Sequence, residues 1–196
     1  MLTIAQIKTE LQSYRPKKLE KYLQRQAAVA MLLTPGEVSP EILFVRRAEY
    51  EGDPWSGDVA FPGGSLEARD AGLRQAAERE VWEEIGLRLQ PQQYLGQLDD
   101  LGGAYLPIQI SCFVYQLTTK PRLRLNGEVA AGFWVPLTQL LSRERRQLSN
   151  ITYRGTSHTH PIIKLDGYCD HFLWGISYRL LESFFSLVGG KTPPQA

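Results

Sequence analysis

Hydrophobic side chains at the start of the chain recur at the spacing of a helix. Apolar residues three or four positions apart share one helix face, and the chain begins with such a series at Ile4, Ile7, Leu11 and Tyr14. Pro16 interrupts the series, which restarts at Leu19. We therefore expect residues 1–26 to form an N-terminal helical segment that covers part of the following domain.

Short apolar runs that are typical of β-strands replace the helical pattern after this segment. They lie at Ala27–Leu33, Ile42–Arg46, Val59–Phe61, Tyr94–Leu98, Ile108–Leu117, Gly132–Val135 and His160–Leu165. Three further helices are predicted at Ala71–Ile85, Gln139–Gln147 and Trp174–Leu187. The order lacks the strict strand–helix–strand alternation of a doubly wound sheet. It therefore favours an α/β fold in which helices cover the faces of a mixed sheet.

Length and composition agree with one such domain. The 196 residues are 43% hydrophobic, include two cysteines, and balance 22 Lys+Arg against 21 Asp+Glu. The near-zero net charge argues against bulk nucleic acid or an anionic membrane as the main partner, and two distant cysteines exclude a disulfide framework. We expect a cytoplasmic protein without a membrane span, with a domain over residues 27–190 and a flexible tail over 191–196.

The predicted helix that ends near Ile85 gathers acidic side chains on one side. At about 100° per residue, with Glu80 at zero, Glu84 falls at about +40° and Glu83 at about −60°. The opposite side carries the apolar residues Val81, Trp82 and Ile85. The helix can therefore dock on a core by one side and present three carboxylates on the other.

Two interpretations fit these acids. A solvated surface tolerates the repulsion between neighbouring glutamates, and so does a site in which a hard divalent cation supplies the missing charge. The preceding Gly63-Gly64 favours the metal site, because glycines let the backbone turn sharply beside the acidic side. A P-loop is excluded, because no Gly-Lys-Ser/Thr follows.

The stretch Gly64–Leu87 resembles the Nudix box, which reads Gly, five residues, Glu, seven residues, and then Arg-Glu-apolar-any-Glu-Glu-any-Gly-apolar. Arg79–Leu87 fits every fixed position. Asp70 stands in place of the usual Glu, and eight residues separate it from Arg79; both departures resemble the coenzyme A pyrophosphatase branch of this family. The resemblance implies an α/β/α sandwich that hydrolyses nucleoside diphosphates linked to another moiety, with Mg²⁺ or Mn²⁺ as cofactor.

The resemblance also implies roles for individual residues. The expected metal ligands are Glu80, Glu83, Glu84 and the carbonyl group of Gly63. Arg79 would hold Glu80 or Glu83 in place, as residues behind a metal ligand often do. Asp70 would cap the helix or brace the preceding loop.

A further acid lies outside the box, at Glu128. The stretches Leu125–Val129 and Phe133–Leu137 resemble the family's Asn-x-Glu-Val loop before a Trp-Val-Pro-Leu strand. Glu128 is therefore interpreted as a metal ligand or general base, while the alternative is a loop glutamate that only contacts solvent. The expected catalytic residues are Arg79, Glu83, Glu84 and Glu128.

Segments before the box also resemble the coenzyme A branch. They are Ser56–Gly64, which resembles Gly-x-x-x-Phe-Pro-Gly-Gly, and the strand Leu43–Arg47. A basic residue is usual four positions before the first glycine, where this chain has Asp53. Other cations must then meet the phosphates of coenzyme A, and arginine can bind phosphate with two hydrogen bonds. The expected substrate contacts are Arg46, Arg47 and Arg69. Trp55 either stacks on adenine or closes its own loop by a hydrophobic contact.

Several functions remain open on the sequence alone. The leading hypothesis is a pyrophosphohydrolase that cleaves coenzyme A, with ADP-ribose, NADH and dinucleoside polyphosphates as other substrates. A sensor of the same fold that binds a nucleotide without cleaving it has no need of this many acids around a metal. An RNA-associated protein has only the basic N-terminal segment in its favour. We expect a small nucleotide as partner, no nucleic acid and no membrane, and leave a homodimer open.

Overall fold

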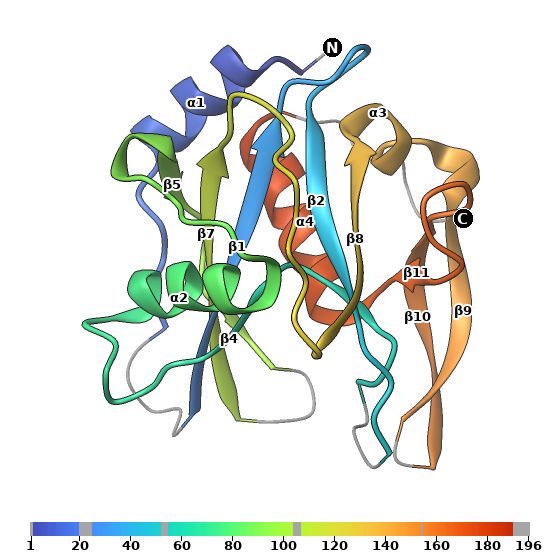
Figure 1. Cartoon of the computed structure of the whole chain (residues 1–196). Coiled ribbons are helices and arrows are strands. Elements are labelled where there is room, and N and C mark those ends of the chain that lie inside the picture. The colour runs from blue at the N-terminus through green and yellow to red at the C-terminus, as the bar shows by residue number, and fades with distance from the viewer. Residues whose placement is uncertain (1, 20–24, 52–54, 104–106, 154, 190–196) are drawn as a thin grey trace.

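The structure is a computed structural model of the chain, and it describes residues 2–19, 25–51, 55–103, 107–153 and 155–189. Three expectations fall outside these residues: most of the helical restart after Leu19, the position of Asp53, and the tail over 191–196. Figure 1 shows the chain with most of its helices and strands labelled.

The helices are α1 (Ile4–Ser13), α2 (Leu73–Ile85), α3 (Leu137–Leu140) and α4 (Gly175–Leu187), with 3₁₀ turns at Pro91–Gln93 and Arg143–Arg145. The strands are β1 (Arg25–Thr34), β2 (Glu41–Arg47), β3 (Val59–Ala60), β4 (Gly63–Ser65), β5 (Tyr94–Gln97), β6 (Leu101–Gly102), β7 (Ile108–Gln116), β8 (Val129–Pro136), β9 (Arg146–Tyr153), β10 (Thr156–Lys164) and β11 (Phe172–Leu173). Among the described residues, no helix has the length and apolar character needed to cross a membrane.

The larger sheet is mixed. Its order is β3-β2-β1-β7-β5, with β4 beside β1, β6 beside β7 and β8 beside β2. Only β1 and β7 pair in parallel among the described strands, with Ala28 opposite Ser111. A smaller antiparallel sheet has the order β11-β10-β9 and lies beside β8 in Figure 1.

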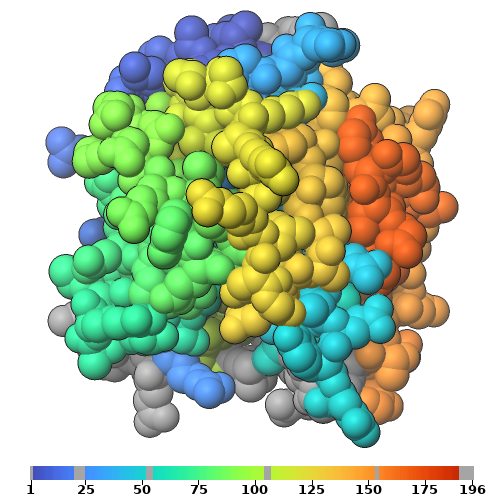
Figure 2. Space-filling view, in the orientation of Figure 1, coloured from blue at the N-terminus to red at the C-terminus, as the bar shows by residue number. Residues whose placement is uncertain are grey.

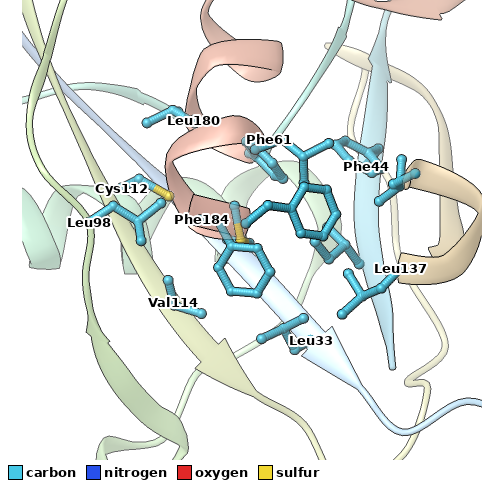
Figure 3. Packing of buried hydrophobic residues seen from close by; sticks show 14 of the residues in the cluster. Leu33, Phe44, Phe61, Leu98, Cys112, Val114, Leu137, Leu180 and Phe184 are labelled. Carbon is cyan, nitrogen blue, oxygen red and sulfur yellow. The ribbon is translucent and has the colours of Figure 1, made fainter. Parts of the chain in front are cut away.

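Helices cover both faces of the larger sheet, which confirms the expected α/β/α arrangement. Side chains of a strand alternate between faces, so β1 turns Ala28, Ala30 and Leu32 toward α2, and Met31 and Leu33 toward α4. Figure 3 shows the α4 face, where Phe184 lies among side chains of several strands, including Leu33 of β1. Because each such side chain contributes about 1.5–3 kcal/mol when it is buried, this packing fixes α4 on the sheet.

The predicted helix Gln139–Gln147 is wrong. Only α3 and a 3₁₀ turn form, and the chain becomes strand β9 at Arg146. The buried Arg146 side chain binds the Leu140 carbonyl at 3.1 Å and Glu182 of α4 at 2.9 Å. Pairing of β9 with β10, together with these contacts to α4, outweighs the local preference for a helix.

Three smaller expectations also need correction. Helix α2 begins after Gly72 without a side-chain cap, so Asp70 does not cap it. Trp82 is 41% exposed, not packed in the core, and Arg88 lies over its ring at 4.4 Å. After α1 the chain is not helical up to Leu19, because Asp99 and Asp100 accept hydrogen bonds from the backbone of this segment.

Candidate active site

Helix α2 carries the acidic residues, and small residues on its buried side let it lie close to the sheet. Ala76 and Ala77 are fully buried against β1 and its neighbours. The helix ends at Gly86, whose φ of 69° is left-handed and whose amide binds the Trp82 carbonyl at 3.0 Å. A side chain at Gly86 would also lie 2.8 Å from Arg124, so glycine is required here for two reasons.

The glycine pair brings β4 into contact with the acids of α2. Gly63 pairs with Val29 of β1, and a side chain there would overlap the Ala28 carbonyl. A side chain at Gly64 would overlap the Glu80 carboxylate. The amide of Gly63 donates a hydrogen bond to Oε2 of Glu84 at 3.0 Å. The two glycines therefore let the backbone approach two of the expected metal ligands directly.

Arg79 connects the loop before α2 with two acidic residues of that helix. Its side chain, 11% exposed, donates two hydrogen bonds to Asp70 at 3.0 and 3.1 Å. It also donates to Glu80 and Glu83, each at 2.9 Å, and to the Ser65 carbonyl at 2.9 Å. One guanidinium thus fixes two acids of the helix against the preceding loop. The bracing role expected for Asp70 agrees with these contacts, because the same carboxylate also accepts the Glu67 amide at 2.9 Å.

The carboxylates repel one another in a partly buried place. Burial, together with the charges of Glu80 and Glu128, raises the pKa of Glu84 to about 8, although the Gly63 amide and Arg47 oppose this. Burial also raises the pKa of Glu80, against the hydrogen bond from Arg79, and the charges of Glu83 and Glu128 add to the rise. The protein therefore concentrates more negative charge here than its own cations neutralise.

The segment before β8 brings Glu128 to this cluster. The amides of Arg124 and Asn126 donate to the carbonyls of Ile85 and Glu84 at 2.9 and 3.0 Å, so this segment runs along the end of α2. Figure 2 shows it in yellow between α2 in green and the chain that follows β2 in cyan. The Glu128 carbonyl in turn accepts the Ala48 amide at 2.8 Å. Glu128 is thus held between α2 and the end of β2.

The four expected substrate contacts lie in different surroundings. Arg47 acts on Glu84 through its charge, and Arg69 pairs with Glu83 at 3.0 Å, so both lie at the acidic cluster. Arg46 instead pairs with Asp170, the carboxylate beside Cys169 and His171, at 3.2 Å. Trp55 is 38% exposed in the loop before β3. The structure therefore places two of the arginines at the cluster, and turns the third toward the chain before β11.

The oxygen atoms gathered here suit a hard divalent cation. A carboxylate has two oxygens, and hydrogen bonds hold Oε1 of Glu80 and Oε2 of Glu84, so each residue has a second oxygen to offer. Burial is the main cause that raises the pKa values of both residues, and the charges of neighbouring glutamates add to it; a divalent cation would neutralise that part of the charge. Carboxylates and carbonyls are the ligands that Mg²⁺ and Mn²⁺ prefer, and the donor set fits either.

A cavity of about 610 Å³ lies on the other flank of α2. Helix geometry places its lining residues Arg74, Gln75 and Glu78 roughly opposite to Glu80, Glu83 and Glu84. Its floor holds the buried residues Asp100, Gln109 and Ser111. The cavity is therefore separate from the acidic cluster.

Sequence reasoning missed two residues beside the cluster. Glu67 pairs with Arg69 at 2.8 Å and lies 3.6 Å from Arg79. Tyr50 donates its hydroxyl to the Gly127 carbonyl at 2.7 Å, next to Glu128. The Tyr50 contact has no local signal, because Tyr50 lies far from Gly127 in the chain. For Glu67, the position within the box was the one available hint.

Comparisons with known proteins agree with this geometry. The family model of the NUDIX domain matches residues 24–154 of the chain. NudL of Salmonella dublin, an uncharacterized Nudix hydrolase, is 29% identical over 193 residues, 97% of each chain, and NudL of Salmonella typhimurium is 28% identical with the same coverage. A MutT/nudix family protein from Enterococcus faecalis has a similar fold, with a TM-score of 0.60 and 16% identity over 97% of this chain and 71% of that chain.

Proposed function

The chain belongs to the NUDIX family and is a Nudix hydrolase, and from this premise we propose that it cleaves the pyrophosphate of coenzyme A. The products would be 4′-phosphopantetheine and adenosine 3′,5′-bisphosphate. The observation that carries the hydrolytic part is the cluster of Glu80, Glu83 and Glu84, held by Arg79 and the glycine pair. A protein that only bound nucleotides would not need several carboxylates that repel one another at a single site.

Nudix hydrolases generally use divalent metal ions, and we propose Glu80, Glu83, Glu84 and the Gly63 carbonyl as the ligands of Mg²⁺ or Mn²⁺. The chemistry that a bound cation supplies is neutralisation of the pyrophosphate and activation of water. Arg79 keeps two of the carboxylates in a fixed orientation, so they need not reorganise during the reaction.

Glu128 completes the proposed catalytic residues. Its charge reaches both Glu80 and Glu84, so it lies close enough to serve the same reaction. It would either accept the proton of the attacking water or join the metal ligands. Both roles require Glu128 to stay close to α2. The hydrogen bonds from the amides of Arg124 and Asn126 to the end of that helix hold the backbone before Glu128 in place.

The choice of coenzyme A rests on the sequence before the box. The segments Leu43–Arg47 and Ser56–Gly64 resemble that branch, and they form β2, β3 and the approach to β4. Coenzyme A differs from its dephospho form by a 3′-phosphate, which needs a cation. We propose Arg47 as the main candidate because its charge reaches the cluster, with Arg69 and Arg46 as further contacts and Trp55 on the adenine.

We also propose that the catalytic domain covers residues 27–190, beyond the part that the family model matches. Buried residues of α4, among them Phe184 and Phe185, share one core with β1 and β7. Removal of α4 would therefore expose this face of the sheet.

One experiment separates these alternatives. Purified protein is incubated with Mg²⁺ or Mn²⁺ and with coenzyme A, dephospho-coenzyme A, ADP-ribose, NADH or diadenosine tetraphosphate, and the products are identified by mass. We expect coenzyme A to have the highest kcat/KM, with dephospho-coenzyme A poorer. Equal values for these two, or faster hydrolysis of ADP-ribose, would contradict the coenzyme A proposal. Binding without hydrolysis of any compound would favour a sensor.

Arg47 offers a sharper test of the substrate. Arg47→Glu should lower kcat/KM for coenzyme A more than for dephospho-coenzyme A, because only coenzyme A carries the 3′-phosphate that Arg47 is proposed to bind. The matched variant Arg46→Glu changes an arginine that pairs with Asp170 and should reduce the preference less. A preference that survives in Arg47→Glu would assign the 3′-phosphate to another residue.

A further inference from the structure

The loop Asn126–Glu128 accepts a hydrogen bond from a side chain that lies far away in the sequence. Tyr50, three residues after the end of β2, donates its hydroxyl to the Gly127 carbonyl at 2.7 Å. Two residues earlier, the Ala48 amide donates to the Glu128 carbonyl at 2.8 Å. The carbonyls on both sides of the Glu128 backbone are therefore held from the same segment.

From these contacts we infer that Tyr50 is a positioning residue, whose hydroxyl orients Glu128 for the hydrolysis proposed above. The inference rests on that proposed function, because only there is Glu128 a general base or a metal ligand. Tyr50 acts through the backbone of Gly127 and is assigned no contact with substrate or metal.

The geometry of the peptide bond explains the effect. The Gly127 carbonyl and the Glu128 amide belong to one planar unit, so a bond to the carbonyl fixes the plane from which the Glu128 side chain departs. Gly127 itself has no side chain to restrict its backbone, and glycine has more conformational freedom than other residues. The Glu128 amide is bound by Oδ1 of Asn126 at 2.9 Å. Together the two bonds fix both ends of this peptide unit.

Tyr50 also connects Glu128 to the proposed substrate loop. The Ser56 hydroxyl accepts the Tyr50 amide at 2.7 Å and donates to the Tyr50 carbonyl at 3.3 Å. Ser56 follows Trp55, the proposed adenine contact. The backbone of Tyr50 is therefore fixed by the loop that faces the substrate, while its hydroxyl holds the loop that carries Glu128.

A purely structural role is the competing explanation. Tyr50 is 53% exposed, so its ring contributes little buried area, and the hydroxyl is the part with a defined partner. Tyr14 provides a matched control, because its hydroxyl donates to Asp99 at the same 2.7 Å in a part of the chain that we place outside the site. Both phenylalanine variants remove one hydrogen bond and leave the ring in place.

The first test is kinetic. Tyr50→Phe should lower kcat for the best substrate by about 2- to 10-fold, the loss expected from one hydrogen bond, with KM unchanged. Tyr14→Phe should leave kcat unchanged. In a Glu128→Gln background, Tyr50→Phe should cause no further loss, because the group that Tyr50 orients is already disabled. A normal kcat in Tyr50→Phe, a change confined to KM, or an undiminished effect in the double variant would each overturn the inference.

The second test needs no activity. Hydrogen–deuterium exchange of the metal-free protein should be faster at the amides of Glu128 and Ala48 in Tyr50→Phe, and unchanged there in Tyr14→Phe. Exchange equal to wild type at both amides would overturn the inference whatever the kinetics. If wild type hydrolyses none of the nucleotides, the proposed function fails, and the exchange measurement still decides whether Tyr50 holds the loop.

Discussion

Glu84 on α2 and Asp100 after β5 are both buried carboxylates, with 4% and 7% of their surfaces exposed, but their surroundings differ. Asp100 accepts hydrogen bonds from four donors, the side chains of Gln97, Gln109 and Ser111 and the backbone amide of Leu19. Glu84 accepts one from the Gly63 amide and has the charges of Glu80 and Glu128 beside it. The protein thus satisfies one buried acid with neutral donors and places the other among like charges.

We interpret this as the difference between a structural acid and an acid of the proposed active site. Four donors replace the water that Asp100 loses on burial, and through Leu19 they fasten the chain after α1 to the sheet. Burial raises the pKa of Glu84 to about 8, the charges of Glu80 and Glu128 add to the rise, and the Gly63 amide and Arg47 offset only part of it. Strained charges of this kind are typical of sites that bind or transform a ligand. The two flanks of α2 therefore carry different roles.

The largest effect is expected from Glu84→Gln. This variant should lower kcat by orders of magnitude, because it removes an anionic ligand of the proposed metal site. The melting temperature of the metal-free protein should be unchanged or higher, since a buried charge among like charges is lost. The matched control Glu78→Gln changes a glutamate on the cavity flank of the same helix and should keep kcat. Normal turnover in Glu84→Gln would remove Glu84 from the catalytic residues.

The second prediction concerns metal binding without catalysis. Mg²⁺ at 100 times its Kd should stabilise the folded wild type by about 2.7 kcal/mol, because it binds the folded state and not the unfolded chain. Glu84→Gln should lose most of this stabilisation, and Glu78→Gln should keep it. Melting curves with and without Mg²⁺ measure both. Equal metal-induced shifts in all three proteins would place the cation elsewhere.

The third prediction concerns Asp100, the buried acid with four hydrogen-bond donors. Asp100→Asn should lower the free energy of unfolding by about 1–3 kcal/mol, because an amide group then faces donors that lose their acceptor. The kcat of the folded variant should equal that of wild type. Urea unfolding and steady-state kinetics give the two values. A variant of normal stability with impaired turnover would reverse the roles that we assign to the two acids.

The acidic face of α2 could be predicted because its information is local. A helical period of about 3.6 residues brings Glu80, Glu83 and Glu84 together whatever the rest of the chain does. The approach of Gly63 and Gly64 to these acids was also predictable, since glycine marks places where backbone must come close. The mixed sheet followed from the order of the apolar runs. These features depend on neighbours within a few tens of residues.

Features that depend on distant contacts could not be predicted. Asp100 has no motif, and its donors come from three separate parts of the chain. Strand β9 replaces a predicted helix because it pairs with β10 and because Arg146 reaches Glu182. The prediction for Trp82, which is 41% exposed, failed because a helical wheel gives the direction of a side chain and not how far other residues cover it. Tyr50 and Gly127 are likewise joined only by the fold.

Asp70 extends the comparison, because it belongs to the box and is a buried acid whose hydrogen bonds come mainly from the cation Arg79 instead of from neutral donors. Its side chain is 2% exposed, and the hydrogen bonds from Arg79 hold its pKa below the ordinary value of 3.8. A lowered pKa in the folded state means that the ionised form stabilises the protein. This contribution is fully present above about pH 3.8 and is lost as the pH falls through the lower folded value.

Asp70→Asn should therefore lower the free energy of unfolding by about 1 kcal/mol between pH 5 and 7, roughly one hydrogen bond, and the gap from wild type should close below about pH 3.8. Urea unfolding at a series of pH values measures this gap. Glu67→Gln is the matched control, because its carboxylate is 48% exposed and lies 3.6 Å from the same arginine, and it should change the stability by less than about 0.5 kcal/mol. A gap for Asp70→Asn that persists unchanged into acid would mean that its charge contributes nothing, and that Arg79 is held by the other carboxylates alone.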